Sequence, residues 1–261
     1  MIKIGCIADQ TRPDAVAMCG KMITKHSFID LNKNLESVDI AVVFGGDGFL
    51  LHSIHNLHES CKTFYGVNYG TVGFLLNSRN LSENDILSVI GSAQRTDLAM
   101  LNVQIESENG QFSCIAMNEV SILRETGQVA KIKISIDGIL RMEELVCDGV
   151  VLSTSAGSTA YNFSLNGPIF SNHARVLSLC PVSSFRPRHW RGALISDLST
   201  VEFEILDKPK RPASATVDFK HFANVSKIKA FLDPSKQITL LFDAKLPIEE
   251  KILREQFEQF D

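Results

Sequence analysis

The stretch Phe44-Gly45-Gly46-Asp47-Gly48-Phe49-Leu50-Leu51 decides the fold of the N-terminal part of this chain. An apolar-rich run at residues 38–44 leads directly into it, and an amphipathic run begins at Phe49. That order is typical of a buried parallel strand, a tight glycine turn and a helix. The glycines leave the backbone bare, so N–H groups and the start of the helix can close on an anion such as phosphate.

Asp47 places a carboxylate in the middle of this bare loop. Because a carboxylate repels phosphate, Asp47 is better suited to a group beside the phosphate, such as a hydroxyl awaiting phosphorylation or a metal ion. Asp-Gly is also a common dipeptide of simple hairpin turns. The loop alone therefore leaves both a phosphate site and a plain turn open.

The composition is that of an ordinary soluble globular protein, with 261 residues, 44% hydrophobic and 21% charged. The net charge of −4 argues against a nucleic-acid-coating protein. The chain has no run of about 18 apolar residues, and its first apolar run, at residues 2–8, is too short for a signal peptide. Six scattered cysteines indicate neither a disulfide framework nor a zinc site. We expect a cytoplasmic protein without nucleic-acid or membrane partners.

Two domains and a terminal segment are expected. Residues 1–96 alternate strand and helix patterns, which predicts an α/β domain with an open, mostly parallel sheet. Residues 97–238 show strict apolar–polar alternation in several short runs, which predicts antiparallel strands in an all-β, sandwich-like domain. Residues 239–261 contain a charged amphipathic helix over 247–260, which we expect to return to the first domain. The alternating runs are 131–136, 201–205, 214–220 and 226–231.

A second informative stretch begins at Asp148 and runs through small and hydroxyl residues to Tyr161. Small side chains let a ligand approach the backbone, hydroxyls bond to ribose or phosphate, and a tyrosine can stack on a base. A Ser/Thr-rich surface loop is the alternative, but the density of Gly, Ser and Thr favours a binding loop. Asn118-Glu119 adds an amide suited to an adenine edge and a carboxylate suited to a ribose diol, although such a pair is more often a turn.

Together these stretches resemble the signature set of the NAD kinase family. The resemblance covers residues 38–170, including the loop at 70–75, with weaker similarity through Asp218. Gly-Gly-Asp-Gly also occurs in diacylglycerol kinases, sphingosine kinases and 6-phosphofructokinases, whereas Gly-Ser-Thr-Ala-Tyr at 157–161 is specific.

The resemblance implies an enzyme that phosphorylates the adenosine 2′-hydroxyl of NAD to give NADP, with ATP or polyphosphate as donor and a divalent cation, Mg²⁺ or Mn²⁺. It makes Asp47 the general base and names no protein residue as a metal ligand. It implies a homo-oligomer, a dimer or tetramer, in which a neighbouring subunit helps to complete the NAD site. The implied NAD or phosphate contacts are Gly45, Gly46, Gly48, His52, Asn118, Glu119, Asp148, Ala156, Thr159, Ala160, Tyr161, Asn162, Phe163 and Ser164.

Five positions depart from the family pattern. Phe49 stands where a small polar residue is usual, and Cys147 replaces a glycine. Ser155-Ala156 replaces a proline-containing pair, and His52 falls where many members have arginine. A lipid or sphingoid-base kinase with the same glycine loop is one alternative. A non-catalytic dinucleotide-binding module is the other.

Overall fold

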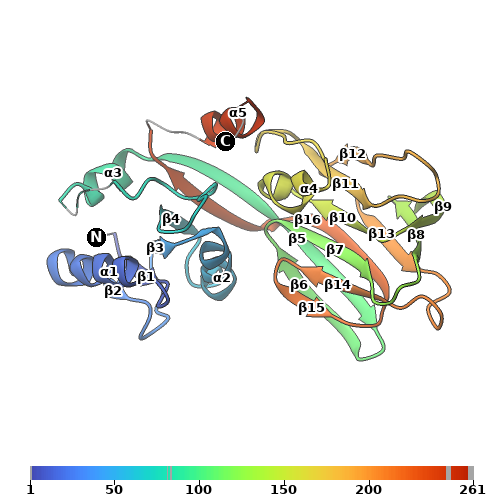
Figure 1. Ribbon diagram of the computed structural model, residues 1–261. Helices are drawn as coiled ribbons and strands as arrows, with labels where there is room; N and C mark the ends of the chain where they lie inside the picture. Colours follow the sequence, from blue (N-terminus) through green and yellow to red (C-terminus); the bar gives the residue numbers. More distant parts are fainter. Residues whose placement is uncertain (1, 81, 83, 245–247, 258–261) are drawn as a thin grey trace. The chain divides into compact units, whose positions relative to one another are not determined.

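The computed structural model describes residues 2–80, 82, 84–244 and 248–257, and the chain divides into two compact units (Figure 1). Unit 1 comprises Met1–Leu98 and Gln237–Asp261, and unit 2 comprises Ala99–Lys236. Two long strands, β5 (Gln94–Ser107) and β16 (Val225–Phe242), contribute residues to both units.

Unit 1 is built on a parallel sheet. Its strands are β1 (Ile4–Ala8), β2 (Ile29–Asp30), β3 (Ile40–Gly45) and β4 (Thr63–Asn68), in the spatial order β2-β1-β3-β4. The C-terminal part of β16 pairs with β4, and every one of these pairings is parallel. The predicted open, mostly parallel sheet is therefore confirmed. Residues of β3 and β4 are largely buried, as expected of strands covered on both faces.

Helices cover both faces of this sheet. Residues of α1 (Pro13–His26) and α3 (Ile86–Ser92) share one apolar core with alternate residues of β1, β3 and β4. Leu50 of α2 (Asp47–Leu57) instead approaches Gly66, which faces the other side of the sheet. The helix starts at Asp47, two residues before the predicted start, because Gly46 is its N-cap.

The C-terminal helix α5 (Ile248–Phe257) returns to unit 1, as the sequence predicted. There its Lys251 contacts the loop after β4. Residues 247 and 258–260 of the predicted helix lie outside the described residues. No helix in the described ranges is long and apolar enough to cross a membrane.

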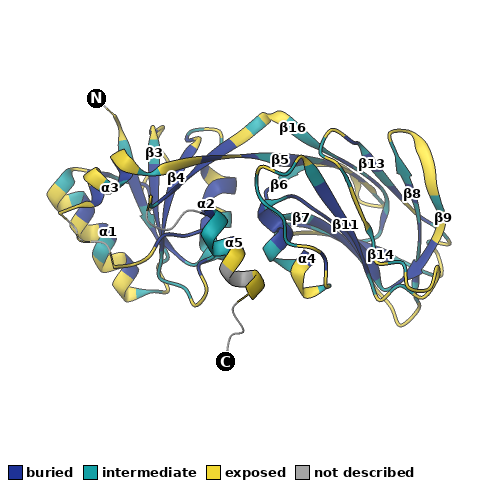
Figure 2. Ribbon diagram, turned by 90° about the horizontal axis from the view of Figure 1, so that it is seen from above, coloured by how far each residue is buried: buried dark blue, intermediate teal, exposed yellow. Residues whose placement is uncertain are grey.

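Unit 2 consists of antiparallel sheets. One has the order β12-β11-β10-β7-β14-β15, and the other joins β9, β8, β13 and the N-terminal part of β16. Residues of both sheets, such as Ile122, Val150, Ile134 and Phe203, form one apolar core, which confirms the sandwich-like domain. Figure 2 shows the strands of both units largely buried.

The strands of unit 2 have the following bounds: β6 (Gly110–Ala116), β7 (Glu119–Arg124), β8 (Ala130–Ile136), β9 (Ile139–Cys147), β10 (Gly149–Ser153), β11 (Val176–Val182), β12 (Ala193–Ser196), β13 (Val201–Ile205), β14 (Ala213–Val217) and β15 (Lys220–Phe222). A 3₁₀ turn, η1 (Ala156–Thr159), and the short helix α4 (Tyr161–Ser164) follow β10.

Candidate functional site

The carboxylate of Asp47 is held by three consecutive backbone N–H groups. Oδ2 accepts hydrogen bonds from Gly73 N at 2.9 Å and Phe74 N at 3.1 Å, and Oδ1 accepts one from Leu75 N at 2.9 Å. An ionised carboxylate offers about four lone-pair positions, so roughly one remains open, on Oδ1. Asp47 therefore fixes the loop after β4, and one lone pair on Oδ1 can still accept a hydrogen bond from a further donor, such as a hydroxyl.

The two glycine loops of unit 1 meet backbone to backbone. A Cβ added to Gly70 would lie only 2.8 Å from Gly46 Cα. The side chain of Asn68 shapes the second loop by accepting from Gly70 N at 2.7 Å and donating to Val72 O at 3.0 Å. Gly73 has φ +74°, and a Cβ there would lie 2.1 Å from Asn68 Nδ2, so this position needs glycine.

The first turn of α2 offers an anion site, and its glycines have different roles. The N–H groups of a helix's first turn have no intrahelical partners and carry partial positive charge. Gly46 is the N-cap and faces Gly70, whereas Gly48 is exposed with no atom within 4 Å of an added Cβ, so Gly48 leaves the approach open. Gly45 is buried, and its missing Cβ makes room for the Phe49 ring instead. His52 lies on the exposed side of the same helix.

Lys251 holds the carbonyl side of the loop whose N–H groups bind Asp47. Its Nζ donates to Gly73 O at 3.3 Å and Phe74 O at 3.2 Å, and also to Leu76 O. Burial lowers the pKa of Lys251 to about 8, and the negative charges of Asp47 and Asp243 oppose this shift. Sequence reasoning missed Lys251, because the helix pattern shows only that some residues of 247–260 face the protein.

In unit 2, Asp218 binds a second loop in the same way. Its Oδ2 accepts a hydrogen bond from Met117 N at 2.7 Å, and its Oδ1 accepts from Asn118 N at 2.9 Å and Glu119 N at 3.3 Å. Asp218 has φ +53° in the turn after β14. Sequence reasoning gave it no role, although it lies within the predicted alternating run 214–220 and ends the region of weaker family similarity.

Asn118 and Glu119 each keep a buried polar atom without a partner among the described residues. These atoms are Asn118 Oδ1 and Glu119 Oε2, and such atoms in a native fold call for a ligand or water. Burial, and then the charge of Asp218, raises the pKa of Glu119 to about 8. Burial and the charge of Glu119 raise the pKa of Tyr161, which places the phenol near this carboxyl. The sequence-predicted residues Asn118, Glu119 and Tyr161 therefore come together.

The small-residue loop packs directly on the Asn118 backbone. Thr154 N donates to Asn118 O at 2.9 Å, and Thr154 Oγ1 donates to Met117 O at 2.6 Å. A Cβ on Gly157 would lie 2.3 Å from Asn118 O, so the close approach requires glycine. The next predicted contacts differ in exposure: Ala156 is buried, Thr159 and Ala160 are half-buried, and Phe163 and Ser164 are exposed.

Asn162, which we expected to contact NAD, is enclosed within the protein. Its side chain is fully buried, and Nδ2 donates to Ser158 O at 3.1 Å and Pro168 O at 3.0 Å. Its Oδ1 accepts from Ser178 Oγ at 2.7 Å. Because both amide protons and the oxygen are engaged within the protein, Asn162 positions the loop and does not offer its amide to a ligand.

Asp148 lies at the opposite end of β10 from this cluster. The register pairs Ser153 with Glu119 and Gly149 with Leu123, so Asp148 lies beyond the far end of the strand. There it forms an ion pair with Arg124, with 2.6 Å between Nε and Oδ1. A five-residue strand spans about 16 Å, so unit 2 of a single chain does not bring Asp148 to Glu119.

In the ranges that the structure describes, no group of three or more His, Cys, Asp or Glu side chains could hold a metal ion. Mg²⁺ in phosphoryl-transfer sites is bound through one or two carboxylates and mainly through substrate phosphates and water. The residues present therefore fit an ion that arrives with a phosphate donor.

The chain is similar to known proteins both in sequence and in fold. A family profile described as "ATP-NAD kinase C-terminal domain" matches residues 117–244. An NAD kinase of Caulobacter vibrioides is 47% identical over 225 residues, which cover 85% of each chain. The fold resembles that of a yeast NADH kinase complexed with NADH, with TM-score 0.80, 17% identity, and coverage of 100% of this chain and 89% of that one. It also resembles an Archaeoglobus fulgidus NAD kinase in complex with ATP, with TM-score 0.76, 20% identity, and coverage of 97% and 99%.

Proposed function

Because the chain belongs to the NAD kinase family, we propose that it transfers a phosphoryl group from ATP to the adenosine 2′-hydroxyl of NAD, giving NADP. The observation that carries this proposal is the pair of unpartnered buried atoms, Asn118 Oδ1 and Glu119 Oε2, close to Tyr161. An amide oxygen and a carboxyl group suit the hydroxyls and ring edges of a dinucleotide, and a phenol ring suits its base. The NADH and ATP named for the two structural neighbours support the same substrates.

Asp47 is the proposed general base. Its Oδ1 accepts only the Leu75 N–H, so it can also accept the proton of the attacking hydroxyl. The three N–H bonds hold the carboxylate in one orientation before substrate binds, and phosphoryl transfer depends mainly on such positioning.

The donor's phosphates are proposed to bind at the start of α2, against the N–H groups exposed around Gly46 and Gly48. A divalent cation, Mg²⁺ or Mn²⁺, would supply neutralisation of phosphate charge. No cluster of side chains among the described residues could hold this ion, so we propose that it is held through the phosphates.

A homo-oligomer, a dimer or a tetramer, is proposed from the position of Asp148. Its carboxylate lies at the far end of β10 from Glu119, so a role in NAD binding requires a second copy of the chain. In a symmetric dimer each copy would provide Asp148 to the other's site.

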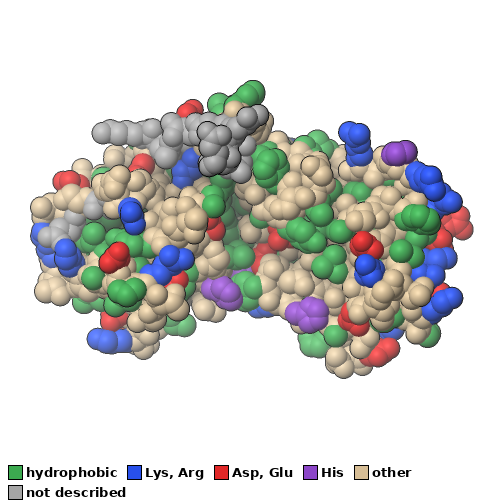
Figure 3. Space-filling model, viewed as in Figure 1, with side chains coloured by type: hydrophobic (Ala, Val, Ile, Leu, Met, Phe, Trp, Pro, Cys, Tyr) green, Lys and Arg blue, Asp and Glu red, His purple; other side chains and the backbone are tan. Residues whose placement is uncertain are grey.

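The proposed location is the cytoplasm, supported by six cysteines that are all free thiols, as in a reducing compartment. Nucleic acid and membrane are not proposed as partners. On the face seen in Figure 3, positive and negative side chains are interspersed and no large basic surface appears.

A coupled assay of NADP formation from ATP and NAD tests the function directly. We expect NADP formation that depends on both substrates and on a divalent cation. Failure to form NADP with ATP or with polyphosphate would contradict the proposal and favour a non-catalytic dinucleotide-binding module. Parallel assays with diacylglycerol and sphingosine as acceptors would reveal a lipid kinase.

A further inference from the structure

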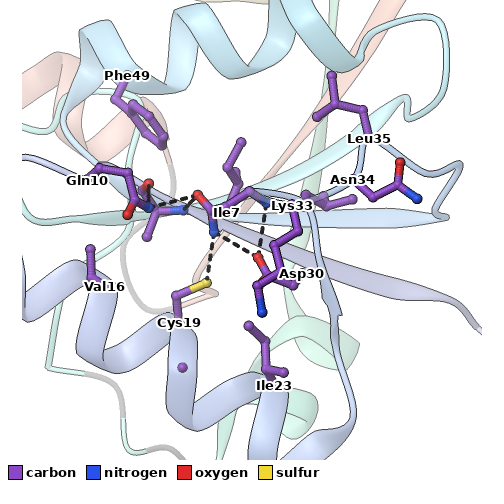
Figure 4. A pocket seen from close by; sticks show the side chains of 14 residues that line it. Ile7, Gln10, Val16, Cys19, Ile23, Asp30, Lys33, Asn34, Leu35 and Phe49 are labelled. Carbon is purple, nitrogen blue, oxygen red and sulfur yellow. Dashed lines mark hydrogen bonds and ion pairs between the residues drawn. The ribbon is translucent and has the colours of Figure 1, made fainter.

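A cavity of about 690 Å³ opens in unit 1 beside the glycine loop. Small-molecule sites typically have about 300–1,000 Å³ and mostly apolar walls. The walls here are apolar side chains from β1, α1, the segment after β2, and α2, namely Ile7, Val16, Ile23, Leu31, Leu35 and Phe49. Figure 4 shows Phe49 reaching in from one side and Val16 and Ile23 from the other, with Ile7 between them.

The position of this cavity in the sheet is one where ligands bind in open α/β folds. The chain leaves β1 through α1 to β2, and leaves β3 through α2 to β4, and β2 and β4 lie on opposite sides of the β1–β3 pair. The carboxyl ends of β1 and β3, where Ala8 pairs with Phe44, are therefore a topological switch point. Ile7 and Ala8, from this end of β1, line the cavity.

Gly20 leaves space in the wall of the cavity, and packing does not require a glycine at this position. It lies in the interior of α1, where glycine is less favourable than alanine. A Cβ added to it would meet no atom within 4 Å, so packing does not demand glycine here. Because Gly20 lines the cavity, the missing side chain enlarges the room available to a ligand.

Phe49 connects the cavity to the start of α2. It is the third residue of that helix, it packs over Gly45, and its ring also lines the cavity. An aromatic ring stacks readily on a nucleobase, whatever the base. Amide side chains at the cavity, such as Gln10 and Asn34, can pair with a base edge. Gln10 is held in place, since its Nε2 donates to Ala8 O at 2.9 Å and Asn32 Oδ1 at 3.0 Å, and its Oε1 is the atom that can accept from a base edge.

We propose that this cavity receives the base and ribose of the phosphoryl donor, so that the chain uses a nucleoside triphosphate in preference to inorganic polyphosphate. The inference rests on the proposed function, because it assumes that the donor's phosphates bind at the start of α2. Polyphosphate offers the same phosphate groups there but has no part that fills an apolar cavity. Phe49, which departs from the family's small polar residue, then acts as a specificity residue for the donor.

Calorimetric binding of Mg-ATP and of magnesium tripolyphosphate to wild type and two variants tests this. Gly20→Leu fills the cavity from α1, and Phe49→Leu removes the ring but keeps an apolar side chain. Both should weaken ATP binding by about tenfold, the effect of losing one stacked base, and leave tripolyphosphate binding within about twofold. Gly91→Leu is the matched control, because Gly91 of α3 also has no atom within 4 Å of an added Cβ and does not line the cavity.

Two results would overturn the inference. One is ATP affinity that stays at the wild-type value in Gly20→Leu and Phe49→Leu. The other is an equal loss of ATP and tripolyphosphate affinity, which would mean that the variants disturb the phosphate site itself. Binding is measured without turnover, so a chain that shows the expected binding pattern but forms no NADP would contradict the proposed function and uphold this inference.

Discussion

Asp47 and Lys251 hold the same loop from opposite sides. The carboxylate of Asp47 accepts the N–H groups of Gly73, Phe74 and Leu75, and the ammonium group of Lys251 donates to the carbonyls of Gly73 and Phe74. The two residues are far apart in the chain, one at the start of α2 and one in α5. The orientation of the proposed base therefore depends on the docking of the C-terminal helix.

Lys251→Met should lower kcat for NADP formation by about tenfold, because the loop that orients Asp47 loses its donors on the carbonyl side. NAD affinity should change by less than about twofold, since Asn118 and Glu119 belong to unit 2. Steady-state kinetics and NAD titration measure the two effects. Lys210→Met, at an exposed position of unit 2, is the control. Wild-type kcat in Lys251→Met would show that α5 does not position the base.

The wild-type rate should also fall as the pH rises through about 8, the value to which burial lowers the pKa of Lys251. Below this pH the ammonium form is present with three donors, and above it the amine has lost one donor and its charge. A kcat profile between pH 7 and 9.5 tests this. The fall in kcat at high pH should be absent from Lys251→Met. A fall that persists in this variant would mean that another group titrates near pH 8.

Glu119→Gln should stabilise the protein increasingly as the pH rises. Burial and Asp218 raise the pKa of Glu119 from its ordinary 4.5 to about 8, so between these values the unfolded chain releases a proton that the folded protein retains. Wild-type stability therefore falls over this range, and glutamine, which does not ionise, avoids the loss. We expect the difference in unfolding free energy to grow by roughly 3.5 kcal/mol between pH 5 and pH 8.

Urea denaturation at both pH values measures that difference. Glu143→Gln, at an exposed position, is the control and should show no such growth. A constant difference between Glu119→Gln and wild type would mean that Glu119 ionises normally in the folded protein.

Mixing two inactive variants should restore activity if Asp148 acts in the site of a second copy. Asp148→Ala and Glu119→Ala should each bind NAD poorly. In a mixed dimer, one site would combine the intact Glu119 of one chain with the intact Asp148 of the other. Randomly mixed dimers should recover about a quarter of the wild-type rate. Failure to recover activity after unfolding and refolding the mixture would remove Asp148 from the NAD site.

The local elements of this fold are predictable from sequence because their signals are local. The predicted strand at 201–205 has the bounds of β13, and the alternating run at 131–136 lies within β8. The expected domain boundaries at 96 and 238 fall inside β5 and β16, and the structure divides the chain at 98 and 236. The sequence pattern predicted only 226–231 of β16, because Asp233-Pro234-Ser235 is typical of a break.

The candidate site was predictable only where a motif marks it. Asp47, Asn118, Glu119 and Tyr161 stand in recognisable stretches, whereas Asp218 reaches Met117 across 101 residues and Lys251 reaches Gly73 across 178. Periodicity reports on neighbours a few positions apart and carries no information on such pairings. The same limit explains Asn162 and Asp148, whose motif positions gave no sign of full internal hydrogen bonding or of placement at the far end of β10.

NADP formation by Asp47→Asn, measured beside its NAD affinity, tests the central claim most directly. Asparagine keeps the size of the side chain but cannot accept a proton from the 2′-hydroxyl. The rate should fall by about 10²- to 10⁴-fold, while the dissociation constant for NAD stays within about threefold of wild type. A variant that keeps more than about a tenth of the wild-type rate would contradict the assignment of Asp47 as the base.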